Sequence, residues 1–434
     1  MSVTDGLLQI VERNRRGERA GIYSICSADR FVLQAGMAQA ARDGSIVTIE
    51  STCNQVNQFG GYTGMAPADF RRFVGTVAAE MGLPETSVVL GGDHLGPYVW
   101  RAEPATSAME KARELVRGCV LAGYTKLHLD TSMRCADDPD GPLDEHHVSE
   151  RAVELCRVAE DAHAELPAGA AAPVYVIGTE VPIPGGELAD TAGPTVTRVE
   201  DVERTMTLTR EAFERRGMGD AWERVLGLVV QPGVEFGDAV VFDYDPEGAR
   251  DLASCVERYP HLVYEAHSTD HQTAGALGRL VQDHFAILKV GPWLTFAMRE
   301  ALFALELIER ELLAGDDRAE TSRLREVLEA TMLAHPEHWE PYHHGGAREL
   351  RLARLFGYSD RARYYWPRSE LREAVGRLLA NLSAREIPAT LLSQYLPAQY
   401  EAVRGGELDA RPVDLVRHKV LEVADLYASA CGMR

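Results

Sequence analysis

Residue types that bind metals and transfer protons follow apolar runs at five places before residue 275 of this chain. At the clearest of these places, Asp93 and His94 follow the apolar run 87–90. An acid beside an imidazole can hold a divalent cation and can also move a proton. The other four places are His128-Leu129-Asp130, Gly178-Thr179-Glu180, Gln231-Pro232-Gly233 and residues 265–270. Because barrel enzymes collect their catalytic residues at the carboxyl ends of parallel strands, the five endings predict one shared active-site face.

Two histidines, His94 and His267, are the leading candidates for metal ligands. Asp130 and Glu180 are the carboxylates that would complete the ligand set. Ligands from separate strand ends hold the ion and leave a coordination position for substrate. A metal held in this way would polarise a carbonyl and stabilise an enediolate, as aldol and isomerase reactions require. Asp93 or Glu180 would transfer the proton, and the residue types do not decide between them.

A shared ion sets a distance condition on the two histidines. With bonds of about 2.1 Å, the two imidazoles must approach within about 8 Å of each other. The alternative is that these polar groups only anchor loops through hydrogen bonds, which is the common role of an isolated Asp–His pair. Five coordinated endings favour catalysis over anchoring.

Lys289 ends the last apolar run of the series. A desolvated lysine forms a Schiff base in class I aldolases, and a lysine here could equally bind substrate or pair with a carboxylate. The metal-type cluster around it favours the second role. Gly291 follows the same run, at the position where barrels often bind a phosphate group.

Other segments have the composition of substrate-binding loops. The loop 53–64 is long and rich in amides and glycine, as expected of a loop shaped over a site. Arg361 and Arg363, in an aromatic segment, could hold a phosphate or carboxylate, or could pack their stems on apolar surface. We predict that at least one of these arginines points into the cavity of His267. The histidine-rich loop 335–344 is interpreted as solvated, because its spacing fits no metal site. The expected substrate-binding residues are Asn54, Gln58, Gln231, Ser268, Asp270, Lys289, Gly291, Arg361 and Arg363.

Eight short apolar or β-branched runs precede residue 300, and segments with helical periodicity lie between them. This alternation predicts the α/β class, and within it a (β/α)8 TIM barrel over residues 1–313. The strand signal then ends, so residues 314–434 are expected to form a C-terminal α-helical extension, a lid or an oligomerisation region. An open doubly wound sheet is disfavoured because no glycine-rich nucleotide loop opens a helix. The predicted strands are 21–26, 45–50, 87–92, 126–130, 174–180, 225–231, 262–267 and 285–290.

The composition of the 434 residues is that of an ordinary globular protein, with 45% hydrophobic and 26% charged residues. A formal net charge of −21 argues against non-specific nucleic-acid binding. The seven cysteines lack C-x-x-C spacing, which is typical of reduced thiols. The chain has no signal-peptide stretch and no apolar run of about 18 residues, so we expect a cytoplasmic protein without a membrane span. The expected assembly is a homo-oligomer.

Eight longer segments carry a resemblance to a known family, and they are residues 53–65, 91–97, 136–139, 178–182, 230–236, 264–270, 288–292 and 363–367. Together they resemble the GatZ/KbaZ family over essentially the whole chain. The resemblance implies a (β/α)8 barrel related to class II aldolases. Some members of the family are non-catalytic partners of class II tagatose-bisphosphate aldolases, and others are metal-dependent 4-epimerases of ketoses, ketose phosphates or tagaturonate.

The resemblance also implies roles for individual residues. Asp93 would be the acid/base, and His94 and His267 would be metal ligands, as in the Asp-His pair of class II aldolases. Zinc is the expected ion, with manganese, nickel and cobalt as alternatives. Tyr98 follows Pro97 where an asparagine is common in the family, and this change bears on substrate choice.

The expected function is C4 epimerisation of a ketose or ketose 6-phosphate in the tagatose pathway. A C4 proton is not α to a C2 ketone, so enolisation cannot invert C4, whereas retro-aldol cleavage of the C3–C4 bond and re-addition can. The alternative, from a different class, is a non-catalytic subunit that stabilises a class II tagatose-1,6-bisphosphate aldolase. Buried charges are costly to keep without use, and this favours the enzyme. The older label of the family as kinases is disfavoured, since no glycine loop that cradles phosphates is visible.

Overall fold

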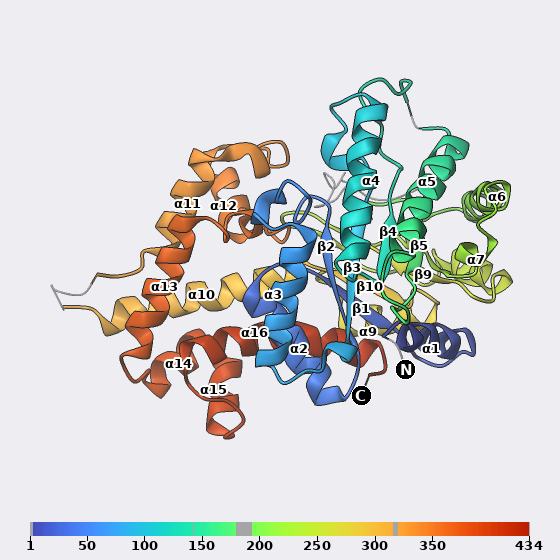
Figure 1. Cartoon of the computed structure of the whole chain (residues 1–434). Helices are drawn as coiled ribbons and strands as arrows, with labels where there is room; N and C mark the ends of the chain where they lie inside the picture. The colour runs from blue at the N-terminus through green and yellow to red at the C-terminus, as the bar shows by residue number, and fades with distance from the viewer. Residues whose placement is uncertain (1–2, 142, 179–192, 316–319, 434) are drawn as a thin grey trace.

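The protein was analysed as a computed structural model, which describes residues 3–141, 143–178, 193–315 and 320–433. Eight parallel strands close into a barrel in the order β1-β10-β9-β6-β5-β4-β3-β2 (Figure 1). The strands are β1 (Ile22–Cys26), β2 (Val47–Thr52), β3 (Val88–Leu95), β4 (Lys126–Leu129), β5 (Val174–Ile177), β6 (Val225–Val230), β9 (Val263–Ala266) and β10 (Ile287–Val290). Each overlaps one of the predicted runs, so the predicted TIM barrel is confirmed.

The strands form because their residues are apolar or β-branched and pack on both faces. At the amino end of the barrel the interior is largely apolar. Helix α1 (Val3–Arg15) closes this end with Leu7 and Val11, which join Ile22, Val89 and Val263 in one buried cluster. The polar residues of the strands are therefore concentrated toward the opposite, carboxyl end of the barrel.

Helices cover the outside of the barrel. In α3, for example, Phe70, Val74 and Val77 share one face and are buried, as their spacing predicts. The helices of this layer are α2 (Arg30–Asp43), α3 (Pro67–Glu80), α4 (Ala105–Leu121), α5 (Glu145–His163), α6 (Val199–Arg215), α7 (Gly219–Trp222), α8 (Arg250–Cys255) and α9 (Ala274–Gln282). Short 3-10 helices are η1 (Gly61–Thr63), η2 (Glu85–Ser87), η3 (Tyr98–Trp100) and η4 (Val256–Arg258). A small hairpin of β7 (Glu235–Phe236) and β8 (Val241–Phe242), which the sequence analysis missed, lies outside the barrel sheet.

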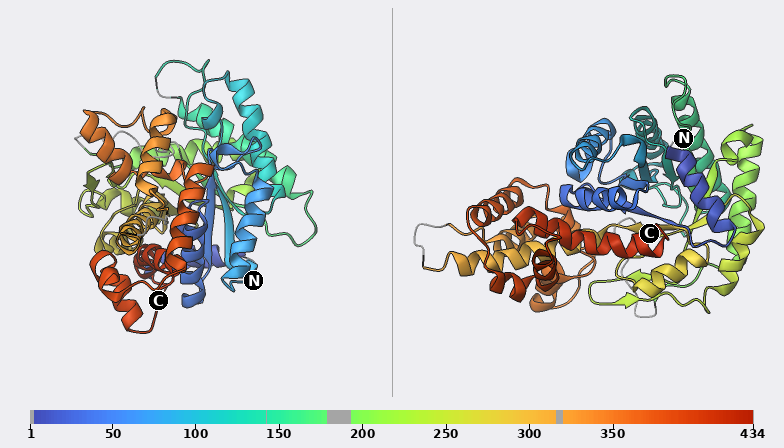
Figure 2. Two further views of the ribbon diagram at one scale, coloured as in Figure 1. Left: turned by 90° about the vertical axis from the view of Figure 1, so that its left-hand side faces the viewer. Right: turned by 90° about the horizontal axis from the view of Figure 1, so that it is seen from below.

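The helix after the last strand, α10 (Pro292–Leu312), leads away from the barrel into the helical extension (Figures 1 and 2). The last helix, α16 (Pro412–Ala430), returns to the barrel and packs against α2, α9 and α10. It thereby covers β1 in the layer where the eighth barrel helix would lie. The other elements of the extension are α11 (Leu324–Ala334), η5 (Pro336–His338), α12 (Ala347–Phe356), η6 (Arg361–Tyr364), α13 (Ser369–Ser383), α14 (Ala389–Tyr395) and α15 (Pro397–Arg404).

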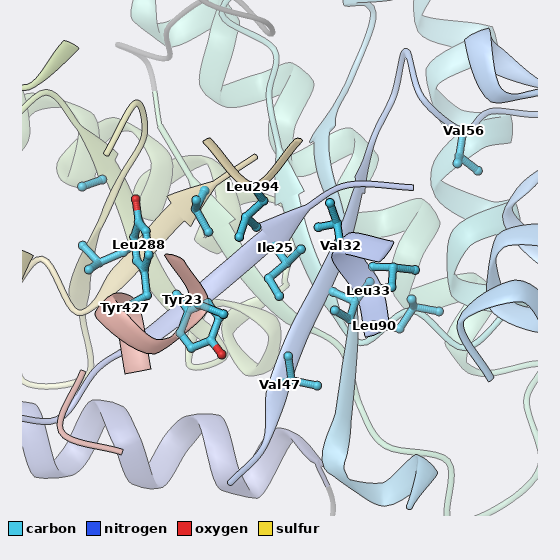
Figure 3. Close-up of a cluster of buried hydrophobic side chains, with 14 of the residues drawn as sticks. Tyr23, Ile25, Val32, Leu33, Val47, Val56, Leu90, Leu288, Leu294 and Tyr427 are labelled. Carbon is cyan, nitrogen blue, oxygen red and sulfur yellow. The ribbon is translucent and has the colours of Figure 1, made fainter. Parts of the chain in front are cut away.

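Tyr427 of α16 ties the extension to the barrel. Its ring lies 5.9 Å from that of Tyr23 on β1, and its hydroxyl donates to the Thr269 carbonyl at 2.7 Å. Figure 3 shows Tyr427 beside Tyr23 and Leu288. We propose residue 313 as the boundary between barrel and extension along the chain, although α16 makes the two one packed body. Among the described residues, no helix combines the length and the apolar character needed to cross a membrane.

Candidate active site and metal centre

Four buried side chains converge at the carboxyl end of the barrel. Asp93 and His94 come from β3, His128 comes from β4, and His267 follows β9. One potential ligand atom from each lies within 4.8 Å of the others. The rings of His94 and His267 are 5.0 Å apart, which meets the distance condition for sharing an ion. The arrangement fits a divalent metal bound by imidazole and carboxylate.

His128 is the member of this cluster that the sequence analysis did not name as a ligand. Its Nδ1 lies 2.8 Å from Asp93 Oδ1, so the tautomer that donates to Asp93 leaves Nε2 as an acceptor. Nε2 is buried and has no hydrogen-bond partner in the described part of the chain. A buried polar atom without a partner is costly, and a metal ion would satisfy it. The available signal was the alternation of Lys126, His128 and Asp130, which directs all three side chains to one face of the strand.

Asp130, expected as a metal ligand, is not a member of the four-donor cluster but contacts one of its histidines. Its Oδ2 is 2.8 Å from His94 Nδ1, and its Oδ1 accepts from the amide and hydroxyl of Ser132. This contact orients the His94 ring and directs Nε2 toward the other donors. His94 itself has a φ of 49°, a conformation that costs energy outside glycine and is found at functional sites. Gly96 permits the close approach of the chain, because a Cβ there would lie 1.6 Å from the Asp130 carbonyl oxygen.

We predict that Asp130→Asn weakens zinc binding by roughly 10–100-fold while the protein stays folded. The amide can still accept from His94 but no longer raises the basicity of the imidazole. Competition with a zinc chelator measures the affinity, and Asp144→Asn, at the start of α5, is the matched control. An unchanged affinity in Asp130→Asn would show that the carboxylate does not support the ligand.

Beneath the donors lies a network of fully buried ion pairs. The Lys126 ammonium is 2.6 Å from both Glu50 Oε1 and Glu265 Oε2. Lys289 pairs with Glu50 and lies 3.0 Å from Asp93 Oδ1. With Asp130, this site holds four carboxylates against two ammonium groups, an excess of two negative charges that a divalent cation would balance.

The environment decides between the two roles considered for Lys289. Burial acts to lower its pKa, but Asp93, Glu50 and Glu265 outweigh burial and hold the pKa well above the ordinary value. A protonated amine is not a nucleophile, so the ion-paired role is favoured over a Schiff base. In contrast, burial lowers the pKa of His267 to about 4, which keeps this imidazole neutral and able to bind a metal.

A cavity opens above the donors and is lined by Asp93, His94 and His267. Six of the expected substrate-binding residues line it, namely Asn54, Ser268, Asp270, Lys289, Gly291 and Arg363. Eight further lining residues were not named as binding residues from the sequence, namely Cys26, Thr52, Gln55, Tyr62, Phe236, Val290, Pro292 and Tyr364. Tyr62 and Tyr364 lie in the two segments, 53–64 and 359–367, whose composition indicated binding.

Three expected binding residues lie elsewhere. Gln58 donates to the Lys111 carbonyl of α4 at 3.0 Å, and the Gln231 side chain accepts from two amides of its own turn. Arg361 stacks on Tyr342, with its guanidinium carbon 3.2 Å from the ring centroid. These three side chains serve local structure instead of lining the cavity. Glu180 lies outside the described residues.

The histidine-rich loop is not solvated as interpreted. His343 is buried, 2.6 Å from the Asp238 carboxylate, and His338 stacks on Tyr364 at 4.7 Å. This loop belongs to the extension and packs against Asp238 of the barrel and Tyr364 of η6, contacts that the sequence pattern does not reveal. The loop thus helps to position one wall of the cavity.

Asp270 supplies a pH-dependent prediction. Its Oδ1 accepts from the Gly291 and Trp293 amides, yet burial raises its pKa to about 6. The folded state therefore holds the proton that the unfolded state releases near pH 4, and stability falls as pH rises from 4 to 6. We expect Asp270→Asn to remove this loss. From pH 4 to pH 7 the free energy of unfolding of the variant should therefore rise, relative to that of the native chain, by up to about 3 kcal/mol. Urea unfolding of both proteins at pH 4 and pH 7 measures this difference. If the stability of the two proteins changes with pH in parallel, the prediction is wrong.

The fold and the site together define a class of protein: a (β/α)8 barrel with a buried imidazole–carboxylate centre suited to a divalent metal. Within this class, the chain belongs to the family described as "D-tagatose-1,6-bisphosphate aldolase subunit GatZ/KbaZ-like", whose profile matches residues 7–432.

Three solved structures are similar to this chain to different degrees. A probable tagatose 6 phosphate kinase from Sinorhizobium meliloti 1021 is 46% identical, with a TM-score of 0.86 over 95% of this chain and 100% of the other. Fructose-bisphosphate aldolase (Fba) from Campylobacter jejuni is 15% identical, with a TM-score of 0.44 over 88% and 93%. The YdjI aldolase from Escherichia coli K12 is 13% identical, with a TM-score of 0.41 over 82% and 93%.

Proposed function

We propose that this protein is a metal-dependent enzyme that inverts C4 of a ketose or ketose 6-phosphate by retro-aldol cleavage and re-addition. The observation that carries the proposal is the four-donor cluster, with the unpartnered His128 Nε2, beneath a polar cavity. His94, His128 and His267 would hold the ion, with Asp93 beside it. The ion is expected to be zinc, with manganese, nickel or cobalt as alternatives. A bound divalent ion supplies polarisation of the C2 carbonyl.

The residues of the chain would carry the proton and orient the sugar. Asp93 or Glu180 takes the proton of the C4 hydroxyl, the C3–C4 bond breaks, and its electron pair remains on C3, delocalised into the C2 carbonyl. The aldehyde then rotates about the C4–C5 bond, C3 attacks the opposite face of C4, and the new O4 alkoxide takes up a proton. The ammonium of Lys289, 3.0 Å from Asp93 Oδ1, offsets negative charge beside the reacting oxygens.

A phosphate on C6 would be recognised mainly by Arg363. Arg363 lines the cavity together with Asn54 and Ser268, both of which can donate hydrogen bonds. The Gly291 amide, expected from the sequence to contact phosphate, already donates to Asp270. We therefore propose that the phosphate binds to Arg363 of the extension and not to the amide that follows the last strand.

We predict that Arg363→Ala raises KM for fructose 6-phosphate at least about 10-fold and leaves KM for free fructose nearly unchanged. Only the phosphorylated substrate loses an ion pair, and one such contact is worth a factor of this order. Steady-state kinetics on both substrates measure the difference. Equal losses on the two sugars would mean that Arg363 only supports the fold.

The description of the family as an aldolase subunit favours a second candidate, a non-catalytic partner that stabilises a class II tagatose-1,6-bisphosphate aldolase. The deciding experiment purifies this chain alone and incubates it with fructose 6-phosphate or tagatose 6-phosphate, with and without zinc. Metal-dependent interconversion supports the enzyme. No interconversion, together with a longer active lifetime of a co-purified class II aldolase, supports the subunit.

Two features of the setting also belong to the proposal. All seven cysteines are free, as expected for a reducing compartment, and we propose the cytoplasm. We also propose a homo-oligomer, which light scattering on the purified chain would test. The proposed partners are sugar or sugar-phosphate substrates, which the hydroxyl, amide and charged side chains of the cavity can bind, and the net charge of −21 disfavours nucleic acid.

A further inference from the structure

Tyr364 is the one ionisable phenol that the helical extension contributes to the described lining of the cavity. It ends η6 and is 7% exposed. Its ring stacks on His338 at 4.7 Å with an interplanar angle of 12°, and meets Tyr62 edge-on at 4.8 Å. These contacts from two separate segments hold the ring in place. Asp93, His94 and His267 line the same cavity from the barrel strands and the loops after them.

The hydroxyl of Tyr364 lies in a cationic environment. Arg363 Nη2 donates to this oxygen at 3.1 Å, and Asn54 hydrogen-bonds to it as well. Arg363 is itself held by the carbonyls of Ser359 and Asp360, so the charge is fixed in position. The guanidinium donor leaves the phenol proton available for transfer and stabilises the phenolate that remains.

The groups facing Tyr364 come from several elements. They are Tyr62 and Tyr98 from barrel loops, His338 from the histidine-rich loop, and Arg361 and Arg363 from η6 itself. Burial acts to raise the pKa of Tyr364, but the two arginines outweigh burial and lower it below its ordinary value. A tyrosine with a lowered pKa is present as phenolate, the proton-accepting form, in a larger fraction near neutral pH than an ordinary tyrosine is.

Inversion at C4 makes a specific demand on proton transfer. Before cleavage, O4 points to one side of the carbon chain, and after the aldehyde rotates it points to the other side. One fixed base therefore cannot serve O4 in both positions, so the cavity needs a second proton-transfer group on another wall. A phosphate on C6 is two carbons from C4, so a ligand anchored at Arg363 brings C4 toward the neighbouring Tyr364.

We propose that Tyr364 is the second acid/base of the reaction, exchanging a proton with O4 from the wall formed by the extension; this inference rests on the proposed function. In one direction the phenolate takes the O4 proton, the O4 electrons form the C4 carbonyl, and the C3–C4 electron pair remains on C3. After rotation, C3 attacks C4, and the new O4 alkoxide takes a proton from the group on the barrel side. Tyr364 then loses its proton to solvent and the barrel-side group regains one from solvent, which restores the starting state. The reverse reaction uses the two groups in the opposite order, and no external reductant or oxidant is needed.

The test compares Tyr364→Phe with the native chain and with Tyr400→Phe, a control on the distant helix α15. All three proteins are loaded with zinc and assayed on fructose 6-phosphate and tagatose 6-phosphate across pH. Phenylalanine keeps the ring contacts, and equal melting temperatures would show that the fold is intact. Tyrosinate absorbance in a pH titration gives a readout that does not depend on turnover.

We expect Tyr364→Phe to lower kcat for epimerisation by about 100-fold or more, with KM changed less than about 3-fold. It should also remove the tyrosinate transition of lowest pKa, which Tyr400→Phe retains. Native-like kcat in Tyr364→Phe, or a rise in KM alone, would overturn the proposal while leaving the proposed function intact. An inactive native chain would instead refute the proposed function.

Discussion

His128→Ala and His267→Ala are each expected to weaken zinc binding by more than about 100-fold. This is a larger loss than the roughly 10–100-fold typical of substituting a residue that only hydrogen-bonds to a metal ligand. Each substitution deletes one of four donors that lie within 4.8 Å of one another. His128 is the sharper test, because its buried Nε2 has no partner in the described part of the chain. Epimerase activity, where present, should fall with the metal.

Metal binding can be measured without any catalytic assay. Zinc that binds the folded state raises the melting temperature of the native chain, and the increase grows with free zinc concentration. We expect this increase to be lost in both histidine variants and retained in His261→Ala, a control at an exposed position. If His128→Ala binds zinc as tightly as the native chain, the four-donor centre is wrong.

Most of the fold could be predicted from the sequence because each barrel strand is a short apolar run with a helical segment after it. Runs such as 225–230, Val-Leu-Gly-Leu-Val-Val, are buried on both faces and need no partner to be recognised. The role of α16 could not be predicted. Its helical pattern is visible, but its place between α9 and α2 depends on where α10 directs the chain.

The candidate site was predicted in part for a similar reason. Residues that end strands, such as Asp93, His94 and His267, can be located from local pattern, since strand ends share one face. His128 lies inside a strand, and only its alternation with Lys126 and Asp130 indicates that it faces the same side as they do. Tyr364 joins the site only because a distant segment folds over the barrel, and no local spacing encodes that contact.

Lys126→Met is expected to cost about 3–5 kcal/mol of folding free energy, the typical loss when one partner of a buried ion pair is removed. Lys126, Glu50 and Glu265 are each fully buried, and the ammonium is 2.6 Å from an oxygen of each carboxylate. Methionine fills similar space but leaves the two carboxylates facing each other. Lys289 pairs with Glu50 but lies 3.8 Å from Glu265, too far to replace Lys126 fully.

Chemical denaturation of the native chain and the variants measures this loss. Lys419→Met is the matched control, because Lys419 pairs with Glu422 at 3.0 Å near the surface and should cost less than about 1 kcal/mol. Adding Glu265→Gln to Lys126→Met should restore part of the stability, since one of the two facing charges is then removed. If Lys126→Met is as stable as the native chain, the carboxylates beneath the metal site are neutral. Their negative charge would then be unavailable to attract a divalent cation, and the charge argument for the metal centre would fail with it.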